Sequence, residues 1–524
     1  MNFPVVKERT LELSHNPTTS PLLIGSALIS LGFVALPLGY LIARALQGDV
    51  ESLRIVVFRA KTVEVLLTTI SLVSIVALLA TLLGSALAWS LHSIKLPNPN
   101  LFRALAILPI AIPSYVFTYC WLSLGVLPAG FLAAVVVLTL STTPYVTLAA
   151  LASLRRVDSA QIDVAQTLGL NQFQIFLRVT LPQMRNALAA GALLVSLYVL
   201  SDFGAVSLLG VDTFTRTIQN TYQGSFDRSS AAVLALMLVA LSGVVISLEV
   251  SSRRRSRIVK SSVAITKQID PIASLRLRIS AFALLTTYIV AALVIPMSVL
   301  LFRFFSRPRP IDFLELGQAA LSTILVATIG AIIALLLAIP VALLALRASL
   351  IGKISERGVL LVNALPGVVM GLALVALGSD FPLIYQTVGL LGVAYAILFL
   401  ARSVGSIRTS LSRVPENLVE IAATLGQSRS RIFYRVTLPL AAPGILTGTL
   451  LVLLSAMKEL PATLMLRPTG FETLATEMWN NTAIFRFSEA APYALLLVII
   501  AAVPTFLISR PDKNNEEETT RENN

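Results

Sequence analysis

The chain has 524 residues, of which 56% are hydrophobic and only 13% charged, and its formal net charge at pH 7 is +13. The apolar residues fall in blocks of about 20, the length at which a helix crosses a bilayer, so an ordinary water-soluble fold is excluded. Backbone groups inside a bilayer must be paired within the protein, and the blocks therefore predict an all-α integral membrane protein.

Twelve apolar blocks follow one another along the chain and predict twelve transmembrane helices. They begin near residues 22, 66, 101, 128, 187, 231, 277, 320, 357, 382, 444 and 489. The pattern divides the chain into a cytoplasmic N-terminal segment (1–21), a first six-span half (22–250), a basic cytoplasmic linker (251–276), a second six-span half (277–509) and a cytoplasmic tail (510–524).

The distribution of lysine and arginine predicts the orientation of these helices. With the N-terminus inside, about 28 of the 40 basic residues lie on the cytoplasmic side, as the positive-inside rule requires. The densest cluster lies in the linker, at Arg253, Arg254, Arg255 and Arg257. We interpret it as a topology signal and expect no nucleic-acid partner.

Metal-ligating side chains are scarce in this sequence. Cys120 is the single cysteine, and the two histidines, His15 and His92, lie far apart. We expect no disulfide, no thiolate cluster and no bound metal.

Two segments of the chain are near-copies of each other. Residues 163–182 and 420–439 are identical at 11 of 20 positions and lie a constant 257 positions apart. Such a duplication indicates two homologous halves. Because each half has an even number of spans, both segments lie on one face of the membrane, which the basic residues predict to be the cytoplasmic face.

Local signals predict a bent pair of short helices in each segment. An apolar stripe at helical spacing comes first, formed by Val157, Val164, Ala165 and Leu168, and by Val414, Leu418, Ile421, Ala422 and Leu425. Glycine then stands where a helix C-terminus adopts a left-handed conformation, at Gly169 and Gly426, and an N-cap residue follows, at Asn171 and Ser428. Pro182 and Pro439 should end the second helix or turn it back toward the membrane.

An exposed amphipathic helix can lie passively at the lipid surface or can dock a partner. Duplication favours docking, because two equivalent elements suit two equivalent sockets on a symmetric partner. The apolar pairs Ile175–Phe176 and Ile432–Phe433 are the expected contacts.

These segments resemble the cytoplasmic signature of binding-protein-dependent ABC importer permeases, in which a Glu-Ala-Ala motif precedes Gly, Ile and Leu-Pro. The second copy matches at Glu420, Ala422, Gly426, Ile432, Leu438 and Pro439. The first copy matches at Ala165, Gly169, Ile175, Leu181 and Pro182, with Asp163 in place of Glu. Val164 stands at the second position of the motif, and both departures are mild, since a carboxylate and a small apolar face are kept.

The resemblance implies a type I ABC importer permease fold with two parallel six-helix repeats. It also implies that the segments are coupling helices, seated on two copies of an ATP-binding subunit. The chain contains no G-x-x-x-x-G-K-[ST] phosphate loop, so we expect ATP to be bound and hydrolysed by that separate subunit, with no cofactor and no enzymatic activity in this chain. A periplasmic or extracellular solute-binding protein would deliver the substrate to the bacterial inner membrane.

Within that family, the fused arrangement is most similar to the ferric-iron permeases. The stretch KELPATLMLRPTGFETLATEMW, which begins at Lys458, is the part most like this branch. Related permeases for thiamine and for phosphonates or other oxyanions remain the alternatives for the substrate. An ion-coupled secondary transporter is the alternative of another class, although it gives no reason for the duplicated segments.

Three charged residues within predicted spans are candidates for the translocation path. Asp202 and Glu459 occupy matching positions in the two halves, and Lys458 precedes Glu459. Two interpretations stay open: a local salt bridge or snorkelling group, or an acidic pair that lines the path and meets a cation. A strongly anionic substrate would fit the second interpretation poorly.

Interrupted spans give a second set of path candidates. Pro109 and Pro113 in the third block and Pro366-Gly367 in the ninth fall at similar places in the two halves. Such interruptions free backbone carbonyls that can line a path, but kinks that serve packing are equally common.

Overall fold

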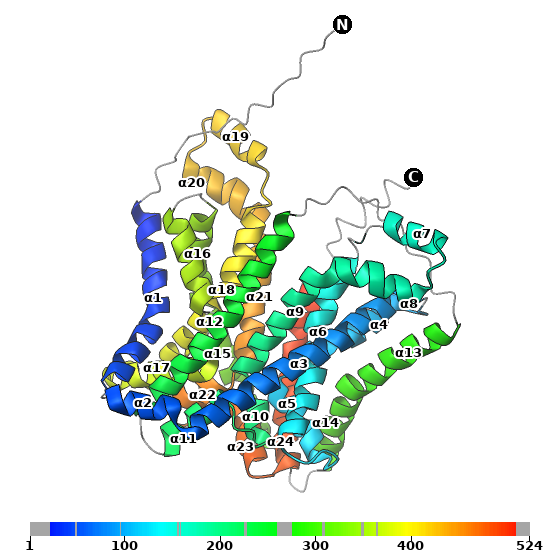
Figure 1. Ribbon diagram of the computed structural model, residues 1–524. Coiled ribbons are helices and arrows are strands. Elements are labelled where there is room, and N and C mark those ends of the chain that lie inside the picture. Colours follow the sequence, from blue (N-terminus) through cyan, green and yellow to red (C-terminus); the bar gives the residue numbers. More distant parts are fainter. Residues whose placement is uncertain are drawn as a thin grey trace.

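The computed structural model describes residues 21–47, 50–94, 96–154, 157, 159–224, 228–258, 275–306, 310–346, 350–362 and 365–509 (Figure 1). Every regular element in these ranges is a helix, which confirms the all-α prediction. Residues 1–20, most of the predicted basic linker and the tail from residue 510 lie outside the described residues. The domain boundaries therefore stay predictions.

In the first half, six predicted spans correspond to long or broken helices. They are α1 (Pro21–Leu46), α3 (Ala60–Ser93), the broken run of α4 (Pro99–Ile107), η1 (Leu108–Ala111) and α5 (Ser114–Ser123), α6 (Phe131–Leu154), α9 (Leu181–Ser201) and α12 (Arg228–Ile258). Shorter elements connect them: α2 (Val50–Phe58), α7 (Ser159–Thr167), α8 (Gln172–Ile175), η2 (Phe176–Thr180), α10 (Gly204–Leu208) and α11 (Phe214–Gly224).

The second half repeats this order. Its spans are the run of α13 (Leu275–Ile289), η3 (Val290–Val294) and α14 (Ile295–Phe305), then α15 (Phe313–Ala345), α16 (Leu350–Val362) with α17 (Gly367–Ser379), α18 (Val388–Leu411), α21 (Leu438–Met457) and α24 (Phe487–Ser509). The connecting elements are α19 (Glu416–Thr424), α20 (Arg429–Ile432), η4 (Phe433–Thr437), α22 (Pro461–Leu466) and α23 (Leu474–Ala483).

The predicted count of twelve spans is not confirmed. Among the described residues, nine helices are long and apolar enough to cross a membrane, and the pair α4–η1 and α5, bent by 94°, makes a tenth. The remaining two blocks contain the shorter apolar stretches Gly367–Ser379 and Phe487–Val503. In one of these blocks α17 begins directly after Pro366 and is shorter than a straight span, whereas α24 runs from Phe487 to Ser509 without a break.

The first helix of each half packs against the other half. In the first half, α1 contacts α15, α16 and α17, and Ser30 and Tyr40 donate hydrogen bonds to the carbonyls of Leu337 and Ala376, at 3.0 Å and 3.1 Å. In the second, α13 contacts α3 and α4, and the Tyr288 hydroxyl donates to the Leu140 carbonyl at 3.0 Å. The halves are therefore interlocked.

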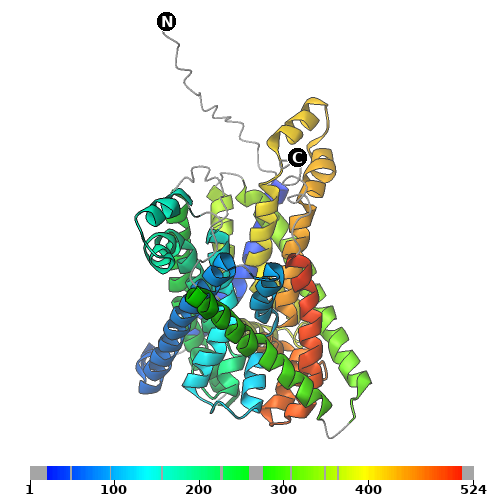
Figure 2. The ribbon, with the colours of Figure 1, turned by 90° about the vertical axis from the view of Figure 1, so that its right-hand side faces the viewer.

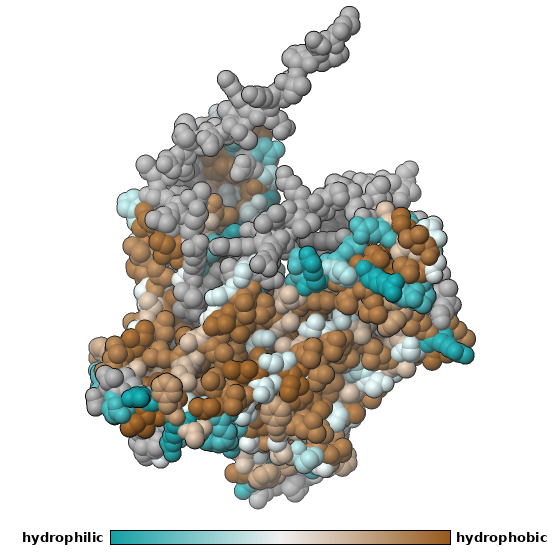
Figure 3. Space-filling view, in the orientation of Figure 1, coloured by the Kyte–Doolittle hydropathy of each residue, from teal (hydrophilic) through white to brown (hydrophobic). Residues whose placement is uncertain are grey.

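The two ends of the bundle differ in the elements that they present. In Figure 1, α7, α8, α19 and α20 lie at one end, while α2, α11 and α23 lie at the other. Figure 2 shows the same arrangement from the side. Apolar residues cover most of the wall between the ends, and hydrophilic residues gather near α7 and α8 and at the opposite rim (Figure 3). Such a belt is the surface that a protein presents to lipid.

Candidate coupling and translocation sites

The first duplicated segment folds as the helical hairpin that its sequence predicts. Helix α7 ends before Gly169, whose φ of 77° lies in the left-handed region that glycine adopts without strain. Asn171 then caps α8: its side chain accepts from the Gln174 N–H at 2.9 Å, and the Gln174 side chain accepts from the Asn171 N–H at 3.0 Å. This reciprocal pair fixes the start of α8.

The second segment has the same geometry. Gly426, at a φ of 73°, follows α19, and the Ser428 hydroxyl accepts from the Arg431 N–H at 3.4 Å. Together with their π-helical turns, we call residues 159–180 the first hairpin and residues 416–437 the second hairpin. Both lie at the same end of the bundle, as the even number of spans requires (Figure 1).

Pro182 and Pro439 do not end the second short helix. Each lies at the start of a long helix, α9 or α21, directly after a π-helical turn. Proline has no N–H to donate four residues back and crowds that carbonyl. The π-turn solves this locally, because the Leu181 N–H reaches the Phe176 carbonyl, and the Leu438 N–H reaches the Phe433 carbonyl. The hairpins are thus continuous with the spans that follow them.

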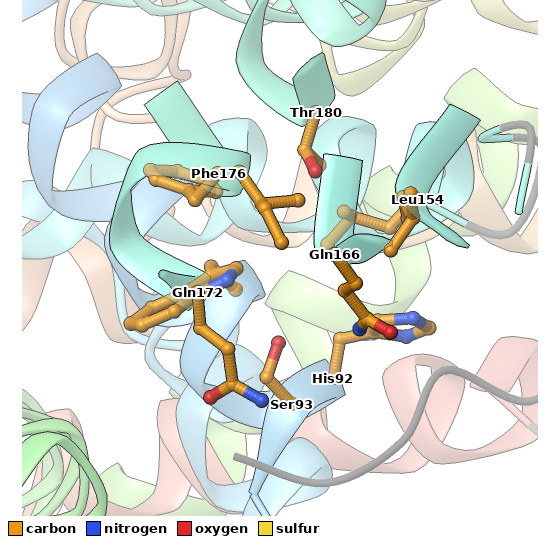
Figure 4. Close-up of a pocket in the computed structure, with 10 residues that line it drawn as sticks. His92, Ser93, Leu154, Gln166, Gln172, Phe176 and Thr180 are labelled. Atoms are coloured by element: carbon orange, nitrogen blue, oxygen red, sulfur yellow. The ribbon is translucent and has the colours of Figure 1, made fainter. Parts of the chain in front are cut away.

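The apolar pair Ile175–Phe176 faces the chain itself. Both residues are buried, at 5% and 8% exposure, and the Phe176 ring lies 5.1 Å from the ring of Trp89 on α3. A small pocket that opens to solvent lies between the hairpin and the ends of α3 and α6 (Figure 4). Gln166 of α7 and His92 of α3 point toward each other across it. These residues form a joint between the first hairpin and the membrane helices.

Exposed apolar residues lie in and directly after α7 and α19, and the first hairpin also exposes Phe173 and Leu177. Val164 and Leu168 of the first hairpin are 58% and 75% exposed, whereas Ala165 beside them is buried. Leu418, Ile421 and Leu425 are exposed in the second hairpin. The carboxylates of Asp163 and Glu420 are exposed too. A partner would therefore contact these exposed residues. The pairs expected from the sequence are less accessible, because Ile175, Phe176 and Ile432 are buried and Phe433 is partly buried.

Asp202 caps a short helix at a break in the membrane region. Its Oδ1 accepts from the backbone N–H groups of Ala205 and Val206 in α10, at 3.0 Å and 3.3 Å, and its Oδ2 accepts from the Ser114 hydroxyl. Asp202 is buried. Unpaired N–H groups are costly inside a membrane, and this carboxylate satisfies two of them.

Glu459 performs the same task in the second half. Its two carboxylate oxygens accept from the N–H groups of Leu460 and Ala462 at the start of α22, at 2.9 Å and 2.8 Å. Within the described part of the chain, neither Asp202 nor Glu459 forms an ion pair, and the Lys458 ammonium instead donates to the Ile110 carbonyl at 3.1 Å. The salt bridge considered from the sequence is absent there.

The predicted path residues meet in two matching groups. Pro113 precedes Ser114, which contacts Asp202, and Pro366 precedes Gly367, at which a Cβ would collide with the Glu459 carboxylate. The longer glutamate therefore fits where glycine leaves room, and the shorter aspartate is met by a serine hydroxyl. Sequence reasoning missed Ser114, whose role depends on this contact between distant spans.

Comparison with known proteins assigns the family. The model of the family described as "Binding-protein-dependent transport system inner membrane component" matches residues 80–257 and 334–513, one copy in each half. The chain belongs to this family.

Relatives of this permease differ in the substrate that their names give. The chain is 29% identical over 501 residues to the Fe(3+)-transport system permease protein FbpB 2 of Haemophilus influenzae, an alignment that covers 94% of this chain and 99% of the relative. It is 27% identical to the molybdate/tungstate permease WtpB of Thermococcus kodakarensis, over 42% of this chain and 90% of the relative. A probable molybdenum ABC transporter permease of Haloferax volcanii is 33% identical over 36% of this chain and 73% of its own.

The permease also holds a polar group that the sequence analysis missed. Arg402 of α18 donates to the Ser455 hydroxyl, and its guanidinium lies 5.1 Å from the centre of the Phe399 ring. Tyr145, Tyr198 and Lys458 lie within electrostatic range of Arg402. We call Tyr145, Tyr198, Arg402 and Lys458 the Arg402 cluster. Arg402 lies within a predicted span, so the rule that selected Lys458 could also have selected it.

Proposed function

We propose that this permease imports ferric iron across a bacterial inner membrane at the expense of ATP. The observation that carries the proposal is the alignment with the Haemophilus influenzae Fe(3+) permease, which covers nearly the full length of both chains, including both halves. The two relatives described above that have other named substrates align with at most 42% of the length of this chain.

The two hairpins support the coupling part of the proposal. Each offers an exposed apolar helix beside an exposed carboxylate, at the same end of the bundle. Two copies of an ATP-binding subunit would seat them, with ATP bound and hydrolysed there. This places the hairpins and both chain termini in the cytoplasm, and a separate solute-binding protein would deliver iron to the opposite face.

The helix breaks support the proposed course of the path. In both halves a capping carboxylate, Asp202 or Glu459, meets a proline-interrupted span at Pro113 or Pro366-Gly367. Breaks of this kind lie at substrate sites in transporters, where irregular backbone is tolerated beside a path. Lys458, which precedes Glu459, would lie at the same level.

An oxyanion is the second candidate substrate, because the molybdate and tungstate permease of Thermococcus kodakarensis aligns over most of its own length. Thiamine remains a third. An ion-coupled secondary transporter would leave the hairpins without a role.

Uptake by cells tests the proposal. Labelled ferric iron, molybdate and thiamine are supplied to cells with and without the gene, with and without depletion of ATP. We expect only the ATP-dependent iron uptake to disappear with the gene. Loss of molybdate or thiamine uptake instead would replace the substrate, and transport that persists after ATP depletion would overturn the ATP-driven mechanism.

A further inference from the structure

The Arg402 cluster lies where equivalent positions of the two halves face each other. Tyr145 and Arg402 are 257 positions apart, the spacing of the sequence repeat, and α6 and α18 begin and end at that same spacing. Tyr198 and Ser455 are a second equivalent pair. Equivalent residues approach each other only near the axis that relates the halves. The cluster therefore lies on the central axis of the permease.

Both halves contribute contacts to the cluster. The rings of Tyr145 and Tyr198, from the first half, lie 5.6 Å apart, and both lie within electrostatic range of Arg402 from the second half. Lys458 of the second half reaches back to the Ile110 carbonyl of the first. A substrate that passes between the halves would meet these four side chains.

Among the described residues, no carboxylate pairs with the cations of the cluster. Arg402 and Lys458 are close enough to repel each other, and neither forms an ion pair within the residues that the structure describes. They contact a hydroxyl, an aromatic ring and a carbonyl, as Arg402 meets Ser455 and Phe399 and Lys458 meets Ile110. Asp202 and Glu459 are engaged with backbone N–H groups. Two cations without an anion are costly within a membrane, so a functional partner is expected.

The cluster is accessible to a ligand. Arg402 is exposed, and Lys458, Tyr145 and Tyr198 are partly exposed, although all four belong to spans or to their immediate ends. A guanidinium presents two parallel N–H donors that match an oxyanion, and an ammonium adds a point charge.

We propose that the Arg402 cluster binds an oxyanion that travels with the iron, so that ferric iron crosses as an oxyanion complex rather than as the bare cation. The inference rests on the proposed function and specifies the chemical form of its substrate. The Arg402 guanidinium donates two hydrogen bonds to the oxyanion, and the Lys458 ammonium balances part of its negative charge. The tyrosine hydroxyls donate to the oxygens that remain. The expectation that an anionic substrate fits this region poorly is reversed, because the carboxylates on which it rested are already used as helix caps.

Reconstituted transport tests this proposal. The permease, with its ATP-binding subunits in liposomes and its binding protein outside, is given ⁵⁵Fe(III) with ³²P-labelled inorganic phosphate, with ¹⁴C-labelled bicarbonate, or in chloride buffer alone. We expect one labelled anion to enter with the iron and iron uptake to fall in chloride buffer. Arg402→Gln and Lys458→Gln should each lower iron uptake about tenfold, the effect of losing one charged hydrogen bond, while Arg402→Lys should keep part of the rate.

The control is Arg408→Gln, which removes the same charge from the same helix but at a position paired with Glu356. It should transport at close to the wild-type rate, and co-purification of the ATP-binding subunits verifies that each variant assembles. Iron uptake that needs neither anion and is unchanged in both Arg402→Gln and Lys458→Gln would overturn the proposal. Labelled molybdate that enters in an Arg402-dependent manner, without any iron uptake by the wild type, would instead support the oxyanion site and overturn the ferric assignment.

Discussion

Asp202 and Glu459 cap equivalent short helices, α10 and α22, with side chains of different length. In the first half, the aspartate accepts two N–H groups of α10 and the Ser114 hydroxyl. In the second, the glutamate occupies the space beside Gly367. Each carboxylate is thus matched to one residue of a distant span, and the two members of a pair should depend on each other.

Exchanging one member of a pair tests this dependence. Asp202→Glu adds a methylene against Ser114, which should lower the free energy of unfolding by about 1–3 kcal/mol, the usual cost of overpacking. The double variant Ser114→Gly with Asp202→Glu reproduces the pair of the second half and should recover at least half of that loss. Thermal unfolding of the purified permease measures both, and additive losses in the double variant would contradict the pairing.

The sequence predicted part of this arrangement. Charged residues within spans selected Asp202, Lys458 and Glu459, because such residues are rare in membranes without a reason. It could not predict which hydrogen bonds they make, since Ser114 comes from a span 88 residues away from Asp202. Arg402 is the opposite case, because the rule that charged residues within spans are functional candidates would have selected it from the sequence.

At the scale of elements, the two hairpins carry the proposed coupling. Leu168 and Leu425 are 75% and 72% exposed and follow α7 and α19 directly. Leucine at such exposure contributes little to the folding of the permease alone, but its burial by a partner would contribute about 1.5–3 kcal/mol to binding.

Leu168→Asp and Leu425→Asp should therefore leave the permease folded and weaken its binding to the ATP-binding subunit by about tenfold or more. Co-purification from detergent measures this binding. The matched control is Leu383→Asp, because Leu383 is 95% exposed in the turn that precedes α18, at the end of this helix opposite the second hairpin. Equal binding by all three variants would show that the hairpins do not dock.

The hairpins were predicted well where the signal is local. The left-handed glycines and the N-cap residues act on neighbouring backbone groups, so Gly169, Gly426 and Asn171 could be assigned from sequence alone. Of the two outcomes expected for Pro182 and Pro439, the second agrees with the structure: each lies at the start of the next membrane helix, after a π-helical turn, and neither ends the helix. Burial of Ile175 and Phe176 depends on Trp89 in a distant span, which periodicity does not show.

For the whole molecule, the interlocking of the halves is the feature that the sequence did not predict. An internal repeat indicates two equivalent units, but not that the first helix of each packs on the other. The composition rule also does not fix the number of straight spans, since an apolar block such as that of α4 and α5 satisfies the rule and is still broken.

A glycine where α1 packs against the second half offers a test of this packing. A Cβ at Gly358 of α16 would collide with the Leu31 side chain of α1, whereas a Cβ at Gly405 of α18 would meet no atom within 4 Å. Gly358→Val should lower the free energy of unfolding by about 1–3 kcal/mol, and Gly405→Val should cost less. Thermal unfolding of the two variants compares them, and an equal loss would indicate that α1 is not held as described.

The central claim is that one chain carries two docking hairpins for an ATP-binding partner. Native mass spectrometry of the complex purified from its host membrane counts the partner subunits directly. The account predicts two ATP-binding subunits for each permease chain, and fewer when Leu168→Asp or Leu425→Asp is introduced. A complex with no ATP-binding subunit, or with a number that neither substitution changes, would contradict it.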